Sequence, residues 1–112
     1  MHDNRPPSLS ALATWLTAQT SYKFALWAWA HAPGGTYGVV TMDQDSTFFA
    51  GGNAEHATRG YVDIFCRTDG FTEKSAVEDA LNASGWHWFH SAVQFEEDTG
   101  TTHHTWSVAW LG

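Results

Sequence analysis

The seven histidines are the residues of this chain whose type best suits metal chemistry, because neutral imidazole is the commonest metal ligand in proteins. Their expected positions argue against one shared ion. If Glu97 faces Thr101 across the last turn, His90 and His104 share a face of the hairpin but lie about 13 Å apart along the strands. His103 points to the opposite face from His104. We therefore predict no metal site.

Side chains suited to acid–base and nucleophilic catalysis are present, but no motif joins them. The candidates are Ser91, Ser107, His103 and Asp98. No G-x-S-x-G elbow holds either serine, and a nucleophile needs a base within reach. Cys66 falls on the apolar face of an expected strand, as a small core residue does. We predict no enzyme, no catalytic residue and no cofactor.

The composition excludes several classes of protein. The chain has 112 residues and a net charge of −7, so it has the size of one domain and no basic surface for nucleic-acid phosphates. Residues 1–7 lack the plan of a signal peptide, and the longest apolar run, residues 24–30, is too short to cross a membrane. With a single cysteine, we expect a soluble protein made in a reducing cytosol.

Aromatic residues are the unusual part of the composition. The chain contains seven Trp, seven Phe and three Tyr. Aromatic side chains dominate the energetics of cores and interfaces, and a protein this small has little core in which to hide them. The composition therefore favours an oligomer.

Hydrophobic periodicity and turn residues predict a single α+β domain over residues 1–112. One helix should run from a Ser8 cap to about Thr20, and a second from a Thr72 cap to a left-handed Gly85. Strands are expected at residues 22–29, 37–42, 47–49, 58–67, 86–97 and 101–111. The order is α-β-β-β-β-α-β-β, and short links favour a mostly antiparallel sheet with both helices packed on one face.

Each expected element has a face that should be buried. The predicted stripes are Leu9, Leu12, Ala13 and Leu16 on the first helix, and Ala76, Val77, Ala80 and Leu81 on the second. In the strand at residues 58–67, Val62, Ile64 and Cys66 should face the core, and Tyr61, Asp63, Phe65 and Arg67 the other side.

The last two strands should form a hairpin whose loop is residues 98–100. With Glu97 opposite Thr101, Trp88 faces Trp110, Ala92 faces Trp106 and Phe95 faces His103. One face then collects Trp86, Trp88, His90, Ala92, Trp106, Val108 and Trp110. The other face collects His87, Phe89, Val93, Phe95, Ala109 and Leu111. The helices cover one of these apolar faces, so the other needs a second copy or a partner, unless the sheet curls and buries both.

Three stretches, taken together, resemble the small tail-completion proteins, or tail terminators, of long-tailed bacteriophages and prophages. They are YGVVTMD at residues 37–43, GYVDIFCRTD at 60–69 and FEEDTGTTHHTW at 95–106, with SAVEDAL at 75–81 between the last two. The family pattern is a G-x-V-D-(I/L)-(F/Y)-x-(R/K) strand before a helix, and then an E-x-(E/D)-T-G-x-x-H-x-x-W hairpin. At His103-His104 the chain departs from it, because one histidine and an aromatic are common there. A neighbouring neck or tail component stays a second possibility.

The resemblance implies a structural virion protein that forms a hexameric ring on the end of the tail tube. Such a ring stops tube polymerisation and gives the head a docking surface. The implied partners are further copies, the tail tube protein and a head-completion or neck protein, with no membrane. DNA would pass through the lumen without specific binding, and the net charge of −7 would help to keep it from sticking. The implied location is the virion tail or neck, after assembly in the host cytoplasm.

Five aromatic residues are the predicted contacts of this assembly: Tyr61, Phe65, Trp88, Trp106 and Trp110. For each of them the alternative is simple burial in the core. A second function of another class is a small ligand-binding module or enzyme that uses the Trp-rich sheet face. His90 or His104 would be its polar handle, and its ligand would be flat or sugar-like.

Overall fold

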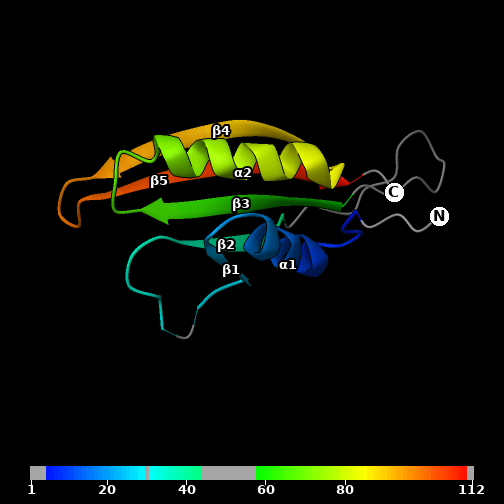
Figure 1. Ribbon diagram of the computed structural model, residues 1–112, viewed down its shortest axis with the longest axis horizontal. Helices are drawn as coiled ribbons and strands as arrows, with labels where there is room; N and C mark the ends of the chain where they lie inside the picture. Colours follow the sequence, from blue (N-terminus) through cyan, green and yellow to red (C-terminus); the bar gives the residue numbers. More distant parts are fainter. Residues whose placement is uncertain (1–4, 30, 44–57, 111–112) are drawn as a thin grey trace.

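The computed structural model describes residues 5–29, 31–43 and 58–110. Its elements are α1 (Leu9–Gln19), β1 (Lys23–Leu26), β2 (Tyr37–Met42), β3 (Thr58–Cys66), α2 (Phe71–Ser84), β4 (His87–Glu96) and β5 (Thr101–Trp110) (Figure 1). The α+β class is confirmed. The strand expected at residues 47–49 lies outside the described residues, and the described elements follow the order α-β-β-β-α-β-β.

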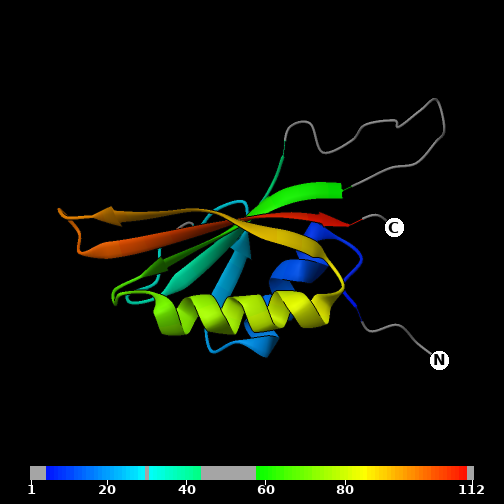
Figure 2. The ribbon, with the colours of Figure 1, turned by 90° about the horizontal axis from the view of Figure 1, so that it is seen from above.

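The five strands form one mixed sheet in the order β1-β2-β3-β5-β4. Three of the pairings are antiparallel, but β1 runs parallel to β2, which departs from the predicted hairpin-linked sheet. The chain returns from the end of β1 to the level where β1 began before β2 starts, as a parallel pair requires. Both helices lie on the same side of the sheet (Figure 2). We call the other side, which no helix of the described residues covers, the open side.

Helix α1 follows its sequence pattern closely. The Ser8 side chain accepts a hydrogen bond from the Ala11 backbone N–H at 3.1 Å, which satisfies one of the unpaired donors of the first turn. All four residues of the predicted stripe, Leu9, Leu12, Ala13 and Leu16, are buried. The stripe lies on the sheet, and the Leu9 side chain sits against Gly60 of β3.

Helix α2 begins differently from the prediction. Thr72 does not cap it: the N-cap is Gly70, with φ 81°, and the Asp69 carboxylate accepts the Phe71 N–H at 3.0 Å. Gly85 ends the helix with φ 81°, as predicted. Val77, Ala80 and Leu81 of the predicted stripe are buried, whereas Ala76 is only half-buried.

The core lies between the helices and the inner face of the sheet. Val62, Ile64 and Cys66 of β3 are fully buried, which confirms the predicted faces of this strand. Trp106 and Val108 extend the same layer onto β5. Burial raises the pKa of the Cys66 thiol to about 12, so this residue is a core side chain rather than a nucleophile.

The predicted register of the β4–β5 hairpin is wrong. Glu96, not Glu97, faces Thr101, so the turn consists of residues 97–100. The register then shifts between His90 and Ala92, which makes Ser91 a β-bulge. In place of the three expected pairs, Trp88 faces Val108, Ala92 faces Thr105 and Phe95 faces Thr102.

The bulge exchanges the two faces of the outer half of β4. Ala92, Gln94 and Glu96 now share the open side with Thr105, His103 and Thr101. Val93 and Phe95 move to the helix side, yet they stay 55% and 64% exposed because the hairpin extends past the start of α2 (Figures 1 and 2). The open side of the hairpin is therefore more polar than the sequence suggested.

Candidate functional site

The open side of the sheet has a row of stacked rings across its three central strands. Tyr37 of β2, Phe65 of β3 and His103 of β5 are paired in register. Their ring centroids are 5.0 Å apart for Tyr37–Phe65 and 4.1 Å for Phe65–His103. The alternation of these strands directs all three rings away from the helices, and each ring stacks on its neighbour, so the row presents ring edges on this side.

An acid holds the end of this row in place. Asp63 Oδ1 accepts hydrogen bonds from His103 Nε2 at 2.7 Å and from the Thr105 hydroxyl at 2.6 Å. The pair resembles the base and orienting acid of a hydrolase, but the described hydrogen bonds join no serine to it. The hydroxyl oxygens of Ser91 and Ser107 instead lie 2.6 Å from each other and share a hydrogen bond. The network therefore fixes the orientation of the imidazole and provides no nucleophile.

A pocket of about 390 Å³ lies beside the row. Its lining is Trp27, Ala28, Trp29, Ala32, Tyr37, Val39, Asp63, Phe65 and His103. Trp27 follows β1 with φ 75°, a conformation that is unusual outside glycine, and its side chain is more than half exposed. Trp29 is anchored, because its Nε1–H donates to the Gly38 carbonyl at 2.9 Å. The pocket presents aromatic faces with one carboxylate and one imidazole.

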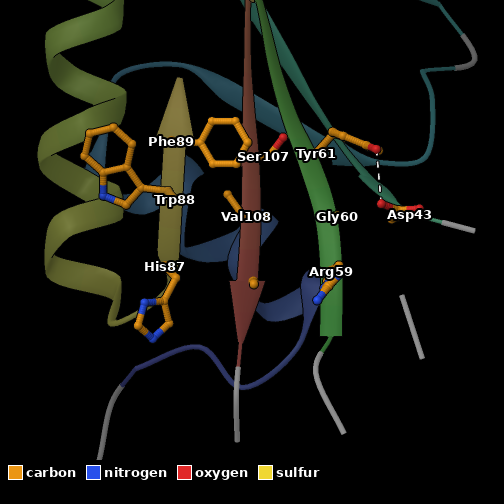
Figure 3. Close-up of a pocket in the computed structure, with 10 residues that line it drawn as sticks. Asp43, Arg59, Gly60, Tyr61, His87, Trp88, Phe89, Ser107 and Val108 are labelled. Carbon is orange, nitrogen blue, oxygen red and sulfur yellow. Dashed lines mark hydrogen bonds between the residues drawn. The ribbon is translucent and has the colours of Figure 1, made fainter. Parts of the chain in front are cut away.

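A second pocket, of about 420 Å³, occupies the other end of the open side (Figure 3). Its lining is Asp43, Arg59, Gly60, Tyr61, His87, Trp88, Phe89, Ser107, Val108 and Ala109. The Tyr61 hydroxyl donates to Asp43 Oδ2 at 3.1 Å, and the Phe89 ring is 63% exposed. In Figure 3 the Phe89 ring lies beside β5 and Tyr61 reaches toward Asp43. Aromatic side chains thus occur at both ends of the open side.

His90 and His104 form a contact that the predicted register excluded. His90 Nε2 lies 3.0 Å from His104 Nδ1, so the expected separation of about 13 Å is wrong. The actual register places His90 opposite Trp106, diagonal to His104. Burial lowers the pKa of both imidazoles. The lowered pKa favours neutral rings, each of which carries one N–H. The nitrogen that carries the hydrogen in one ring therefore donates to the bare nitrogen of the other.

The surroundings of this pair are those of a core. Glu78 of α2 accepts from Trp106 Nε1 at 3.0 Å and from Lys74 Nζ at 3.0 Å. His104 Nε2 is buried without a hydrogen-bond partner. Within the part of the chain that the structure describes, no three His, Cys, Asp or Glu side chains are grouped to hold a metal.

The five predicted contact residues fall on both sides of the sheet. Tyr61 and Phe65 lie on the open side. Trp88 and Trp110 lie on the helix side and are half-buried, and Trp88 Nε1 donates to Asn82. Trp106 is fully buried, so in this conformation it belongs to the core of a single copy and not to an outer surface.

Two aromatic residues of the open side, one half-buried and one exposed, were not among the predicted contacts. Tyr37 and Phe89 stand there beside the predicted Tyr61 and Phe65. The alternation of β2 and β4 already assigned a face to each. The sequence did not show which face of the sheet the helices cover, because both faces of the hairpin were expected to be apolar.

No helix in the described ranges is both long enough and apolar enough to span a membrane. A comparison of the sequence with models of known protein families and with curated proteins finds no match in either.

Proposed function

We propose that this protein is a structural component of a phage tail, a tail terminator that assembles as a hexameric ring on the end of the tail tube. The ring would stop tube growth and join the tube to the head–neck complex. The proposal combines the sequence resemblance with the α+β fold. It assigns no catalytic step and no cofactor, and its partners are further copies, a tail tube protein and a neck protein.

The observation that best supports assembly is that, in the part of the chain that the structure describes, the sheet has helices on one side only. The opposite side carries Tyr37, Tyr61, Phe65 and Phe89, among which Phe89 is 63% exposed. A rigid sheet with aromatic side chains and shallow pockets is well suited to a protein–protein contact, because Tyr, Phe and Trp are enriched in the buried centre of interfaces. We therefore assign the ring contacts to this side. Tyr61 and Phe65 stay among the contact residues, and Tyr37 and Phe89 take the place of the three tryptophans, Trp88, Trp106 and Trp110, which lie on the helix side or in the core.

The experiment measures the mass of the purified protein by sedimentation and images phage particles by electron microscopy. We expect a hexamer, or a ring at the junction of head and tail. Phe89→Asp should reduce the mass by placing a charge in the contact. Phe71→Asp is the matched control, because Phe71 is an equally exposed Phe on the helix side. A protein that stays monomeric and is absent from particles contradicts the proposal.

The pocket at Trp27 and Trp29 favours a second candidate, a small ligand-binding module. Its aromatic walls and the Asp63 carboxylate fit the apolar faces and hydroxyl groups of a sugar ring. Titration with mono- and disaccharides, followed by tryptophan fluorescence, tests it. Saturable quenching that Trp27→Ala abolishes would support it over assembly, whereas no change with any sugar would contradict it.

A further inference from the structure

Strand β4 is an open edge of the sheet. It is last in the strand order, and eight of its ten residues are exposed. Within residues 5–29, 31–43 and 58–110, no strand pairs with its outer side. An edge of this length offers a row of backbone donors and acceptors to another strand.

The opposite edge of the sheet is closed. Strand β1 has four residues, and α1 lies against it. The Thr17 hydroxyl of α1 accepts from the Phe24 N–H at 2.9 Å and contacts the Phe24 carbonyl at 3.4 Å. These bonds occupy the groups that an added strand would need. An edge-to-edge contact that joined β4 of one copy to β1 of the next is therefore blocked.

The outer half of β4 lacks the residues that protect natural edge strands. Residues 92–96 contain no lysine and no proline, and the bulge at Ser91 comes before them. Val93 and Phe95 project on one side, 55% and 64% exposed. Only Glu96 is charged. This half of the strand is regular, it is apolar on the side of Val93 and Phe95, and it is open to pairing.

The sequence of this segment is complementary to itself. In an antiparallel pair of two β4 strands centred on Gln94, Val93 of each copy faces Phe95 of the other, and the two Gln94 amides face each other. The same register keeps the acids of the hairpin tip apart. Glu96 of each copy faces Ala92 of the other. A parallel pair would instead align acid with acid.

We propose that two copies of this chain pair through β4 about a two-fold axis at Gln94, which makes one continuous ten-stranded sheet. The contact goes beyond the proposed ring. A ring is built from head-to-tail contacts, whereas this contact is two-fold, and the two use different surfaces. Its occupant is a second copy, because β4 paired with itself aligns Val93 with Phe95 and keeps the two Glu96 carboxylates apart.

Cysteine cross-linking tests the register. In Gln94→Cys the two new cysteines face each other at the two-fold axis. Their Cα atoms then lie within the 4.4–6.8 Å that a disulfide requires. In the control Glu96→Cys they lie about 13 Å apart along the strands. Cys66 is fully buried and adds no background. With oxidised glutathione we expect a covalent dimer from Gln94→Cys at least ten times faster than from Glu96→Cys. No dimer, or equal rates for the two variants, overturns the proposal.

A second measurement does not depend on the new cysteines. The double variant Val93→Lys/Phe95→Lys is made in the Phe89→Asp background, where the ring contact is removed. It should keep its circular dichroism spectrum, because both side chains are exposed, and its sedimentation mass should fall from that of a dimer to that of a monomer. An unchanged mass overturns the two-fold contact. Phe89→Asp, which tests the ring, should leave the Gln94→Cys cross-link intact, so failure of the ring and failure of this contact give different results.

Discussion

Gly70 shows how a single residue sets the start of a helix. Its φ of 81° is left-handed, and an added Cβ would lie 2.6 Å from His104 Nε2 and 3.2 Å from Thr102 Cγ2. The chain therefore turns into α2 directly above β5, with no room for any side chain. Thr72 had the residue type of a cap, but this close approach places the cap two residues earlier.

Gly70→Ala should destabilise the protein by about 2–4 kcal/mol, because a left-handed alanine and a crowded Cβ both cost free energy. Gly35→Ala is the matched control. Its φ is 87°, but nothing lies within 4 Å of the added Cβ, so only the backbone cost of about 1–2 kcal/mol remains. Urea unfolding measures both values. Equal losses would contradict the steric contact at Gly70.

The His90–His104 pair makes stability depend on pH. Burial lowers the pKa of both imidazoles below the ordinary value of 6.5, so the unfolded chain binds protons before the folded one. Stability should be highest above pH 6.5 and should fall as the pH drops through 6 toward 5. Glu78, whose pKa is also lowered, contributes only below its ordinary value of 4.5.

Thermal unfolding between pH 7.5 and 5 measures this slope. His90→Gln removes one of the two titrating groups and keeps a side chain that can donate to His104, so the slope should become shallower. His87→Gln is the control, because His87 is exposed. A slope that His90→Gln leaves unchanged would show that the pair does not cause it.

At the scale of the element, the bulge at Ser91 decides what β4 presents. On its N-terminal side, Trp88 and His90 face the helices. On the C-terminal side of the bulge, Val93 and Phe95 also face the helices, although simple alternation would place them on the open side. The extra residue has no partner on β5, and its hydroxyl contacts Ser107.

Deletion of Ser91 should therefore be tolerated. His90 opposite Trp106 and Ala92 opposite Thr105 would become consecutive regular pairs, and every remaining side chain would keep its face. The loss should be about 1 kcal/mol, from one exposed hydrogen bond. Deletion of Phe89 is the control. It turns either Trp88 or His90 to the open side, so the free energy of unfolding should fall several times more than on deletion of Ser91. Urea unfolding distinguishes the two, and equal losses would contradict the bulge.

At the scale of the whole molecule, charge opposes association. Each copy carries a net charge of −7, so copies repel one another at low salt. The aromatic side of the sheet and the Val93–Phe95 edge are apolar, and salt does not weaken contacts of that kind. Assembly should therefore depend on the screening of the net charge.

The sedimentation mass should rise between about 50 mM and 500 mM sodium chloride, where the screening length falls from roughly 14 Å to 4 Å. Phe71→Asp adds a charge outside both surfaces and should shift the transition only slightly. Dissociation at high salt would show that ion pairs hold the copies together, contrary to an apolar contact.

Features of the fold that depend on local order could be predicted from the residues alone. The spacing of Leu9, Leu12, Ala13 and Leu16 placed α1, and the alternation of β3 placed Val62, Ile64 and Cys66 in the core. Gly85 marked the end of α2. Each of these follows from a period of 3.6 or 2 residues, or from one backbone conformation, within a few neighbouring residues.

Features that depend on pairing between distant residues became known only from the three-dimensional arrangement of the strands. The parallel arrangement of β1 and β2, the bulge at Ser91 and the contact of His90 with His104 all follow from which strand lies beside which, and in what register. A register shift of one residue turns every later side chain to the other face, and no local period records it. For this reason the sequence could name the aromatic residues but could not say which side of the sheet would present them.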